Sequence, residues 1–188
     1  MQKEREEELV EACKNARGRD AVAIVKDLMK LPFVPMHGPV HHVIDGCALL
    51  TAMHNAGAAF SLEEAVHELI HRGEEMPGGS CGLWGMCGSS SSAGAALAIV
   101  HGTGPLSGNR YYKDNLQLTS KALGRIGEIG GPRCCKRNAY LSLSTAIAFV
   151  KDRYGLPLEQ SPIVCEFSPK NEQCLKRNCP FYPENHPL

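Results

Sequence analysis

Apolar residues recur along much of the chain at the period of an α-helix, about 3.6 residues. The clearest example follows Ser61, which forms a capping box with Glu64 and precedes a continuous apolar stripe of Leu62, Ala65, Val66, Leu69 and Ile70. Related patterns predict two helices within residues 3–30, separated by Gly18, and one each over residues 39–55, 89–101, 114–127 and 138–154. Few stretches favour β-strands, so the pattern predicts a mostly α-helical protein.

Segments rich in glycine, proline and cysteine separate these helices. Residues 77–88 contain five glycines and two cysteines, and residues 130–135 form a second loop of this kind. Residues 156–188 contain six prolines and three cysteines with little periodicity. We therefore expect a compact helical domain over residues 1–155 and an irregular, cysteine-rich, metal-binding tail over residues 156–188 that packs on it.

The charges are balanced, because Lys+Arg and Asp+Glu each number 20. Proteins that bind nucleic acids normally carry a basic patch, so the composition argues against such a partner. The first residues are too polar for a signal peptide, and no apolar run reaches the roughly 20 residues of a membrane-spanning helix. These features predict a soluble, cytoplasmic protein with neither a membrane nor a nucleic acid as partner, and they leave its oligomeric state open.

Nine cysteines are unusual for a protein of a reducing compartment, where disulfides are rare. Cys13 and Cys47 fall within helical patterns and are expected in the core. The other seven form three groups, which indicates metal or redox chemistry. These candidate metal ligands are Cys81 and Cys87, Cys134 and Cys135, and Cys165, Cys174 and Cys179.

The tail carries the most informative of these groups. Cys165, Cys174 and Cys179 lie within fifteen residues of irregular chain, and a proline follows Cys179 as in ferredoxin-type runs. Their spacing matches neither a zinc finger nor a standard ferredoxin. We expect an iron–sulfur cluster of the 4Fe–4S type, with zinc as the alternative. Adjacent cysteines rarely bind one ion together, so the fourth ligand is expected from Cys81, Cys87 or one of Cys134 and Cys135.

The glycines around Cys81 and Cys87 are candidates for contact with a cofactor. Gly79, Gly82 and Gly88 lack side chains, so their backbone amides can approach a ligand closely. Cys87 also precedes an expected helix, whose positive end favours a thiolate. The loop is therefore expected to help bind the cofactor; the alternative is two small buried residues in a tight turn.

Three histidines near the expected helix at residues 39–55 are candidate catalytic residues. His41 and Asp45 are one helical turn apart and share a face, and His37 and His42 lie close by in sequence. A histidine–carboxylate pair can support a metal ligand or perform acid–base chemistry. We expect His37, His41, His42 and Asp45 to line a substrate site or to stand behind the metal ligands; the alternative is a surface pair.

A second histidine motif is expected to have no metal. His67, Glu68 and His71 match the HExxH pattern of zinc peptidases. They lie opposite the apolar stripe of the helix that follows Ser61, so all three side chains are expected to face water.

The histidine and cysteine motifs together resemble a known domain family. Met36-His37-Gly38-Pro39, the segment Pro77–Gly88 and the tail cysteines resemble an uncharacterised Cys/His-rich family of anaerobic prokaryotes, over residues 32–182. Its members occur alone or as the C-terminal tail of S-adenosylmethionine-dependent methyltransferases. The resemblance implies a methyltransferase or a radical enzyme as partner and a small molecule as ligand. It implies no particular reaction.

Residues 79–135 also resemble, more loosely, redox-active proteins named for a Cys-Gly-Cys-Ala-x-x-Gly-Cys-Cys pattern. This chain departs from that pattern with Ser-Ser-Ser-Ser-Ala-Gly over residues 89–94.

The sequence supports one leading function and three alternatives. The first is a cytoplasmic iron–sulfur protein with a redox, sulfur-handling or accessory role for a cofactor-dependent enzyme. The alternatives are an enzyme with an open metal position near His37, His41 and His42, a metal-free thiol–disulfide protein, and a structural zinc protein. Whether the protein is itself an enzyme stays open.

Overall fold

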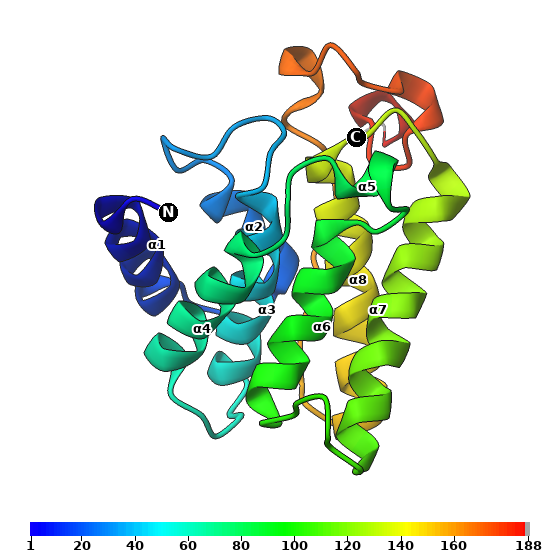
Figure 1. Cartoon of the computed structure of the whole chain (residues 1–188). Coiled ribbons are helices and arrows are strands. Elements are labelled where there is room, and N and C mark those ends of the chain that lie inside the picture. The colour runs from blue at the N-terminus through cyan, green and yellow to red at the C-terminus, as the bar shows by residue number, and fades with distance from the viewer. Residues whose placement is uncertain (187–188) are drawn as a thin grey trace.

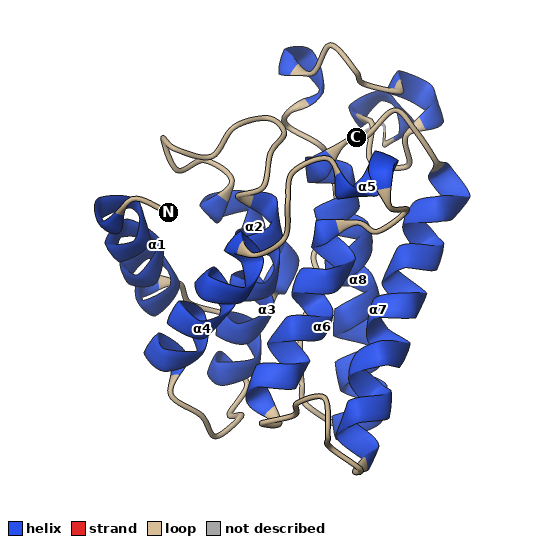
Figure 2. Cartoon of the chain, viewed as in Figure 1, coloured by secondary structure: helices blue, strands red, loops and turns tan. Residues whose placement is uncertain are grey.

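The computed structural model describes residues 1–186 and contains eight α-helices and three short 3-10 turns (Figures 1 and 2). No strand occurs in this range. The predicted mostly helical fold is therefore confirmed. The helices are α1 (Lys3–Asn15), α2 (Ala21–Leu28), α3 (His41–Asn55), α4 (Leu62–Glu74), α5 (Ser80–Leu83), α6 (Gly88–Val100), α7 (Arg110–Ile129) and α8 (Cys135–Tyr154), and the turns are η1 (Ser168–Lys170), η2 (Lys176–Asn178) and η3 (Pro183–Asn185).

None of the helices in residues 1–186 has both the length and the apolar character needed to cross a bilayer. Of the range expected for the tail, residues 187 and 188 lie outside the described residues.

Helix α3 is the centre of the bundle. It contacts α1, α2, α4, α6 and α8, and twelve of its fifteen residues are buried. Cys47 and, on α1, Cys13 are fully buried, as predicted. His41 and Asp45 are buried too, so the alternative of a surface pair is wrong: neighbouring helices cover this face of α3.

Two helices begin earlier than the hydrophobic pattern predicts. Helix α7 starts at Arg110 because Asn109 Oδ1 accepts hydrogen bonds from two backbone N–H groups of its first turn. Helix α8 starts at Cys135 because the Cys134 thiol accepts the backbone N–H of Arg137 at 3.4 Å. Both helices begin at a polar cap, and the spacing of apolar residues does not predict where such a cap lies.

The predicted exposure of the HExxH side chains is confirmed. The five apolar residues of the stripe are buried within α4, while His67, Glu68 and His71 are exposed. The His67 ring lies against Glu6 of α1, with Nδ1 2.8 Å from Oε1. The segment forms the solvent-facing side of a packed helix.

The tail runs back along the bundle from the end of α8 and folds over the end at which α3, α6 and α8 begin (Figure 1). Asp20 holds the tail against the bundle. Its Oδ1 caps α2 by accepting hydrogen bonds from the N–H groups of Val22 and Ala23, and its Oδ2 accepts a hydrogen bond from the N–H of Ser161. One carboxylate thus joins a helix start to the tail.

Asp20→Ala is expected to lower the free energy of unfolding by about 2 kcal/mol, because it removes a helix cap and a tail contact together. Asp20→Asn retains one acceptor oxygen and should lose less. Urea unfolding followed by circular dichroism measures both variants. Equal losses would contradict the capping role.

Candidate metal centre

Two cavities lie at the end of the bundle where the tail sits, on either side of the Cys134–Cys135 step. The tail cavity is enclosed mainly by α8 and the tail, and four of its lining residues are cysteines: Cys134, Cys165, Cys174 and Cys179. The helix-start cavity is lined by three other cysteines, Cys81, Cys87 and Cys135. The seven candidate ligands thus divide four and three.

Each cysteine of the tail cavity has a backbone N–H group near its sulfur. Arg137 donates its N–H to Cys134 Sγ at 3.4 Å, and Lys176 donates to Cys174 Sγ at 3.3 Å. The N–H groups of Phe167 and Phe181 act in the same way on Cys165 and Cys179, two residues before each. Amide donors of this kind stabilise thiolates and tune the potential of clusters that thiolates bind.

Burial favours the neutral form of two of these thiols when no cation is present. It raises the pKa of Cys165 and of Cys179, and the N–H groups only partly oppose this effect. The neighbouring Cys134 thiol raises both pKa values further, because two thiolates repel each other. A cationic centre between the sulfurs would remove this repulsion and deprotonate the thiols.

Basic and aromatic side chains complete the wall. Lys136 is almost fully buried, with its ammonium 4.6 Å from the Phe167 ring centroid, and burial lowers its pKa to about 8. Tyr140 packs edge-on against Phe181, and its buried hydroxyl has no hydrogen-bond partner. Arg137 donates hydrogen bonds to the carbonyls of residues 130 and 132 and so stabilises the loop before Cys134. These cations would offset the negative charge of four thiolates.

A single metal ion and a cluster need different distances between their cysteine ligands. Among residues 1–186, no three Cys, His, Asp or Glu side chains converge closely enough to hold one metal ion. A tetrahedral zinc site with bonds of about 2.3 Å needs neighbouring sulfurs about 3.8 Å apart. A cluster places its own iron and sulfide atoms between the thiolates, so its ligands stand farther apart. The described residues therefore contain no preformed site for a single metal ion.

The tail cavity is narrow. Its volume is only about 20 Å³. Binding a cluster therefore requires side chains and turns of the wall to move outward. The turns around Cys174 carry exposed residues and belong to no long helix, so that movement disturbs little of the core.

His37 connects the start of α8 to the tail. Its Nδ1 accepts the N–H of Cys135 at 3.5 Å, so the proton of the neutral ring is on Nε2, which faces Asn171 Oδ1 at 3.1 Å. Asn171 in turn donates to Cys134 Sγ at 3.5 Å. Burial lowers the pKa of His37, which favours this neutral ring. His37 thus positions Asn171 behind a candidate ligand.

The helix-start cavity has a volume of about 220 Å³ and is lined by His41 and His42 as well as by its cysteines. His42 Nδ1 donates to the carbonyl of Met76, which leaves Nε2 free. A Cβ atom on Gly88 would lie 1.9 Å from the His42 ring, so only glycine allows the ring to sit there. Gly79 also lines the cavity, whereas Gly82 is not among its lining residues. Burial lowers the pKa of His42.

Asp45 lies fully buried next to His41, and neither carboxylate oxygen has a hydrogen-bond partner. His41 Nδ1 is 3.7 Å from Asp45 Oδ1, while its Nε2 faces the carbonyl of Pro35. An unsatisfied buried carboxylate is costly, so a structure that keeps one invites a functional explanation. The predicted histidine–carboxylate pair is thus brought together, one helical turn below the cavity.

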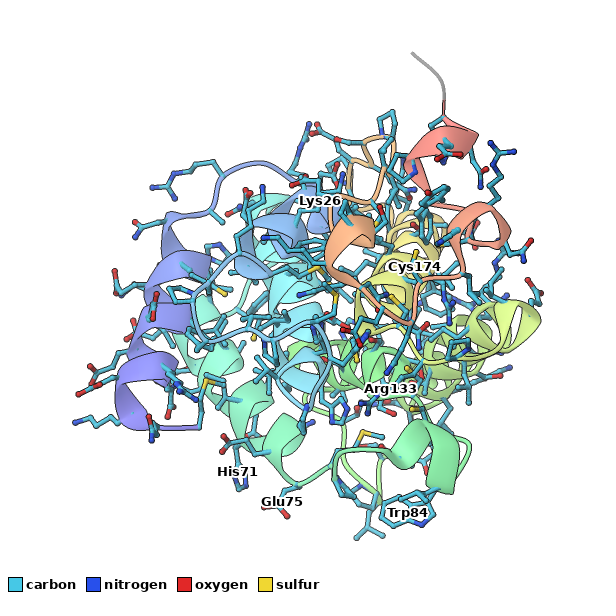
Figure 3. The ribbon with its side chains drawn as sticks, turned by 90° about the horizontal axis from the view of Figure 1, so that it is seen from above. Lys26, His71, Glu75, Trp84, Arg133 and Cys174 are labelled. Carbon is cyan, nitrogen blue, oxygen red and sulfur yellow. The ribbon has the colours of Figure 1, made fainter. Side chains whose placement is uncertain are left out.

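Five polar residues with a part in the two cavities were not identified from the sequence: Arg133, Lys136, Arg137, Asn138 and Asn171. The first four flank Cys134 and Cys135 closely in sequence, and that proximity was the available signal. Figure 3 looks onto this end of the molecule and shows Arg133 between the parts of the chain that carry Cys174 and Trp84.

The chain belongs to a family described as a family of unknown function (DUF5714), whose model matches residues 9–182. No curated protein and no solved structure is significantly similar to it. The matched range includes every cysteine and both cavities.

Proposed function

We propose that this protein binds an iron–sulfur cluster of the 4Fe–4S type through Cys134, Cys165, Cys174 and Cys179. The observation that supports the proposal most strongly is the shared cavity. Cys134, which caps α8, lines the same cavity as three cysteines of the tail that follow it by more than thirty residues. Each of the four sulfurs has a backbone N–H group beside it. Core cysteines without a ligand need no such arrangement.

The bound cluster would supply one-electron transfer. The chain's own residues would hold and tune it: amide N–H groups stabilise the thiolates, and Lys136 and Arg137 balance their charge. Asn171 orients Cys134, and His37 orients Asn171. Phe167 and Phe181 limit the access of water.

We infer a redox or accessory role for this centre in a reducing, cytoplasmic setting. The resemblance of the histidine and cysteine motifs to the tails of S-adenosylmethionine-dependent methyltransferases supports a methyltransferase or a radical enzyme as the partner. The looser likeness to small redox-active proteins points in the same direction.

The test is metal and acid-labile sulfide analysis of the full chain purified and reconstituted without oxygen. We expect brown protein with broad absorbance near ~400 nm, equal amounts of iron and sulfide, and an electron paramagnetic resonance signal on reduction. Colourless protein with stoichiometric zinc and no iron would refute the proposal. Metal-free protein with oxidised Cys81 and Cys87 would instead favour a thiol–disulfide role.

A further inference from the structure

The N-terminal ends of three long helices meet at the helix-start cavity. Its lining includes His41 and His42 of α3, Gly88 and Ser89 of α6, and Cys135 of α8. These helices have 15, 13 and 20 residues, and each carries a partial positive charge at its first turn. In Figure 1 the three helix starts lie at the same end of the bundle. Three positive helix ends therefore surround one space.

The charged side chains at this cavity add to the same field. Arg133 lines it and is exposed, and no Asp or Glu is among the lining residues. The buried Asp45 carboxylate is not among the lining residues, although its charge acts on Lys136 and His42. Arg133 and the helix ends are therefore the positive groups that a ligand would meet in the cavity.

A buried polar group without a partner also faces this space. Asn138 lines the cavity and is only 4 % exposed, and its Oδ1 has no hydrogen-bond partner. Its Nδ2 donates to Cys87 Sγ at 3.3 Å, which fixes the amide in place. A buried acceptor of this kind normally has a protein, water or ligand donor. Asn138 is therefore available to a donor group on a bound molecule.

We propose that the helix-start cavity binds a small molecule through its carboxylate or phosphate group, held by Arg133 and attracted by the positive field of the N-terminal ends of α3, α6 and α8. The volume of about 220 Å³ exceeds what a bare ion fills, so the ligand has a body as well as an anionic group. Asn138 Oδ1 would accept a hydrogen bond from that body. The proposal does not depend on a cluster in the tail cavity.

Cys81 reports on this cavity, because it is exposed and lines it. The full chain is alkylated with negatively charged iodoacetate or with neutral iodoacetamide, and the rate constants at Cys81 are measured by mass spectrometry. Arg133→Gln should lower the iodoacetate-to-iodoacetamide ratio about fivefold, because one nearby positive charge is lost. The matched control is Arg125→Gln, which removes an exposed charge from α7 and should leave the ratio unchanged.

Protection experiments then identify the anionic group. Inorganic phosphate and acetate are each tested for slowing the iodoacetate reaction, with acetamide as the neutral control. Stronger protection by phosphate supports a phosphate-bearing ligand, and stronger protection by acetate supports a carboxylate. Asn138→Asp, nearly isosteric, should weaken protection by adding a negative charge.

Two results would overturn the proposal. One is a ratio that Arg133→Gln does not change. The other is a lower ratio without protection by either anion, because a positive field without a binding site would explain it. Neither result bears on the iron content of the tail cavity, so failure here and failure of the cluster proposal are distinguishable.

Discussion

Cys134→Ala is expected to reduce the iron and sulfide content of the reconstituted protein to background, whereas Cys135→Ala should leave both unchanged. Cys134 lines the tail cavity with three other cysteines, while its neighbour lines the helix-start cavity. Removing one of four thiolate ligands opens the cluster to solvent and loss. Two adjacent substitutions of the same kind should therefore have opposite outcomes.

The pair also controls for general damage to α8. Alanine at position 134 removes the cap that accepts the N–H of Arg137, which should cost about 1 kcal/mol and leave the helix folded. Circular dichroism of both metal-free variants checks this point. Equal loss of iron from the two variants, or loss from Cys135→Ala alone, would show that the assignment of ligands is wrong.

Gly46→Ala is expected to lower the free energy of unfolding by about 3 kcal/mol, a large effect for one methyl group. Gly46 lies in α3 against α6, and its N–H donates to Ser92 Oγ at 2.8 Å. A Cβ atom there would lie 2.5 Å from Leu69 Cδ2 and 2.6 Å from the backbone oxygen of Ser92. The backbone oxygen cannot rotate aside, so α3 and α6 must separate.

Gly124→Ala is the matched control for this prediction. Gly124 is an exposed residue within α7, and a Cβ atom there would meet nothing within 4 Å. The substitution should stabilise the protein by about 0.5–1 kcal/mol, because alanine loses less backbone entropy in a helix. Guanidinium unfolding measures both variants. A neutral effect of Gly46→Ala would mean that the two helices are packed more loosely than the structure indicates.

The close approach at Gly46 also matters for the site. It sets α6 against α3, and the same pair of helices brings Gly88 beneath the His42 ring. A variant that separates them should therefore disturb the helix-start cavity more than the tail cavity. Alkylation of Cys81, measured as above, reports the first effect, and iron content reports the second.

The sequence by itself determined most of the secondary structure. The stripe of α4 and the exposure of His67, Glu68 and His71 followed from helical periodicity, since that period is a local property of the chain. The core positions of Cys13 and Cys47 followed in the same way. The grouping of the other cysteines marked them as candidates for one kind of chemistry, and the adjacency of Cys134 and Cys135 suggested that they would not act together.

Only the tertiary structure decided which of these candidates lie together. Cys134 ends a loop and Cys135 begins a helix, so the two thiols reach different cavities. Cys134 lies beside the tail, and Cys135 lies beside the starts of α3 and α6. These segments are far from the two cysteines in sequence. His37 contacts the tail through Asn171, which lies 134 positions away in sequence. Periodicity describes the face of a single helix, whereas a cavity depends on how several chain segments pack, and only the folded chain determines that packing.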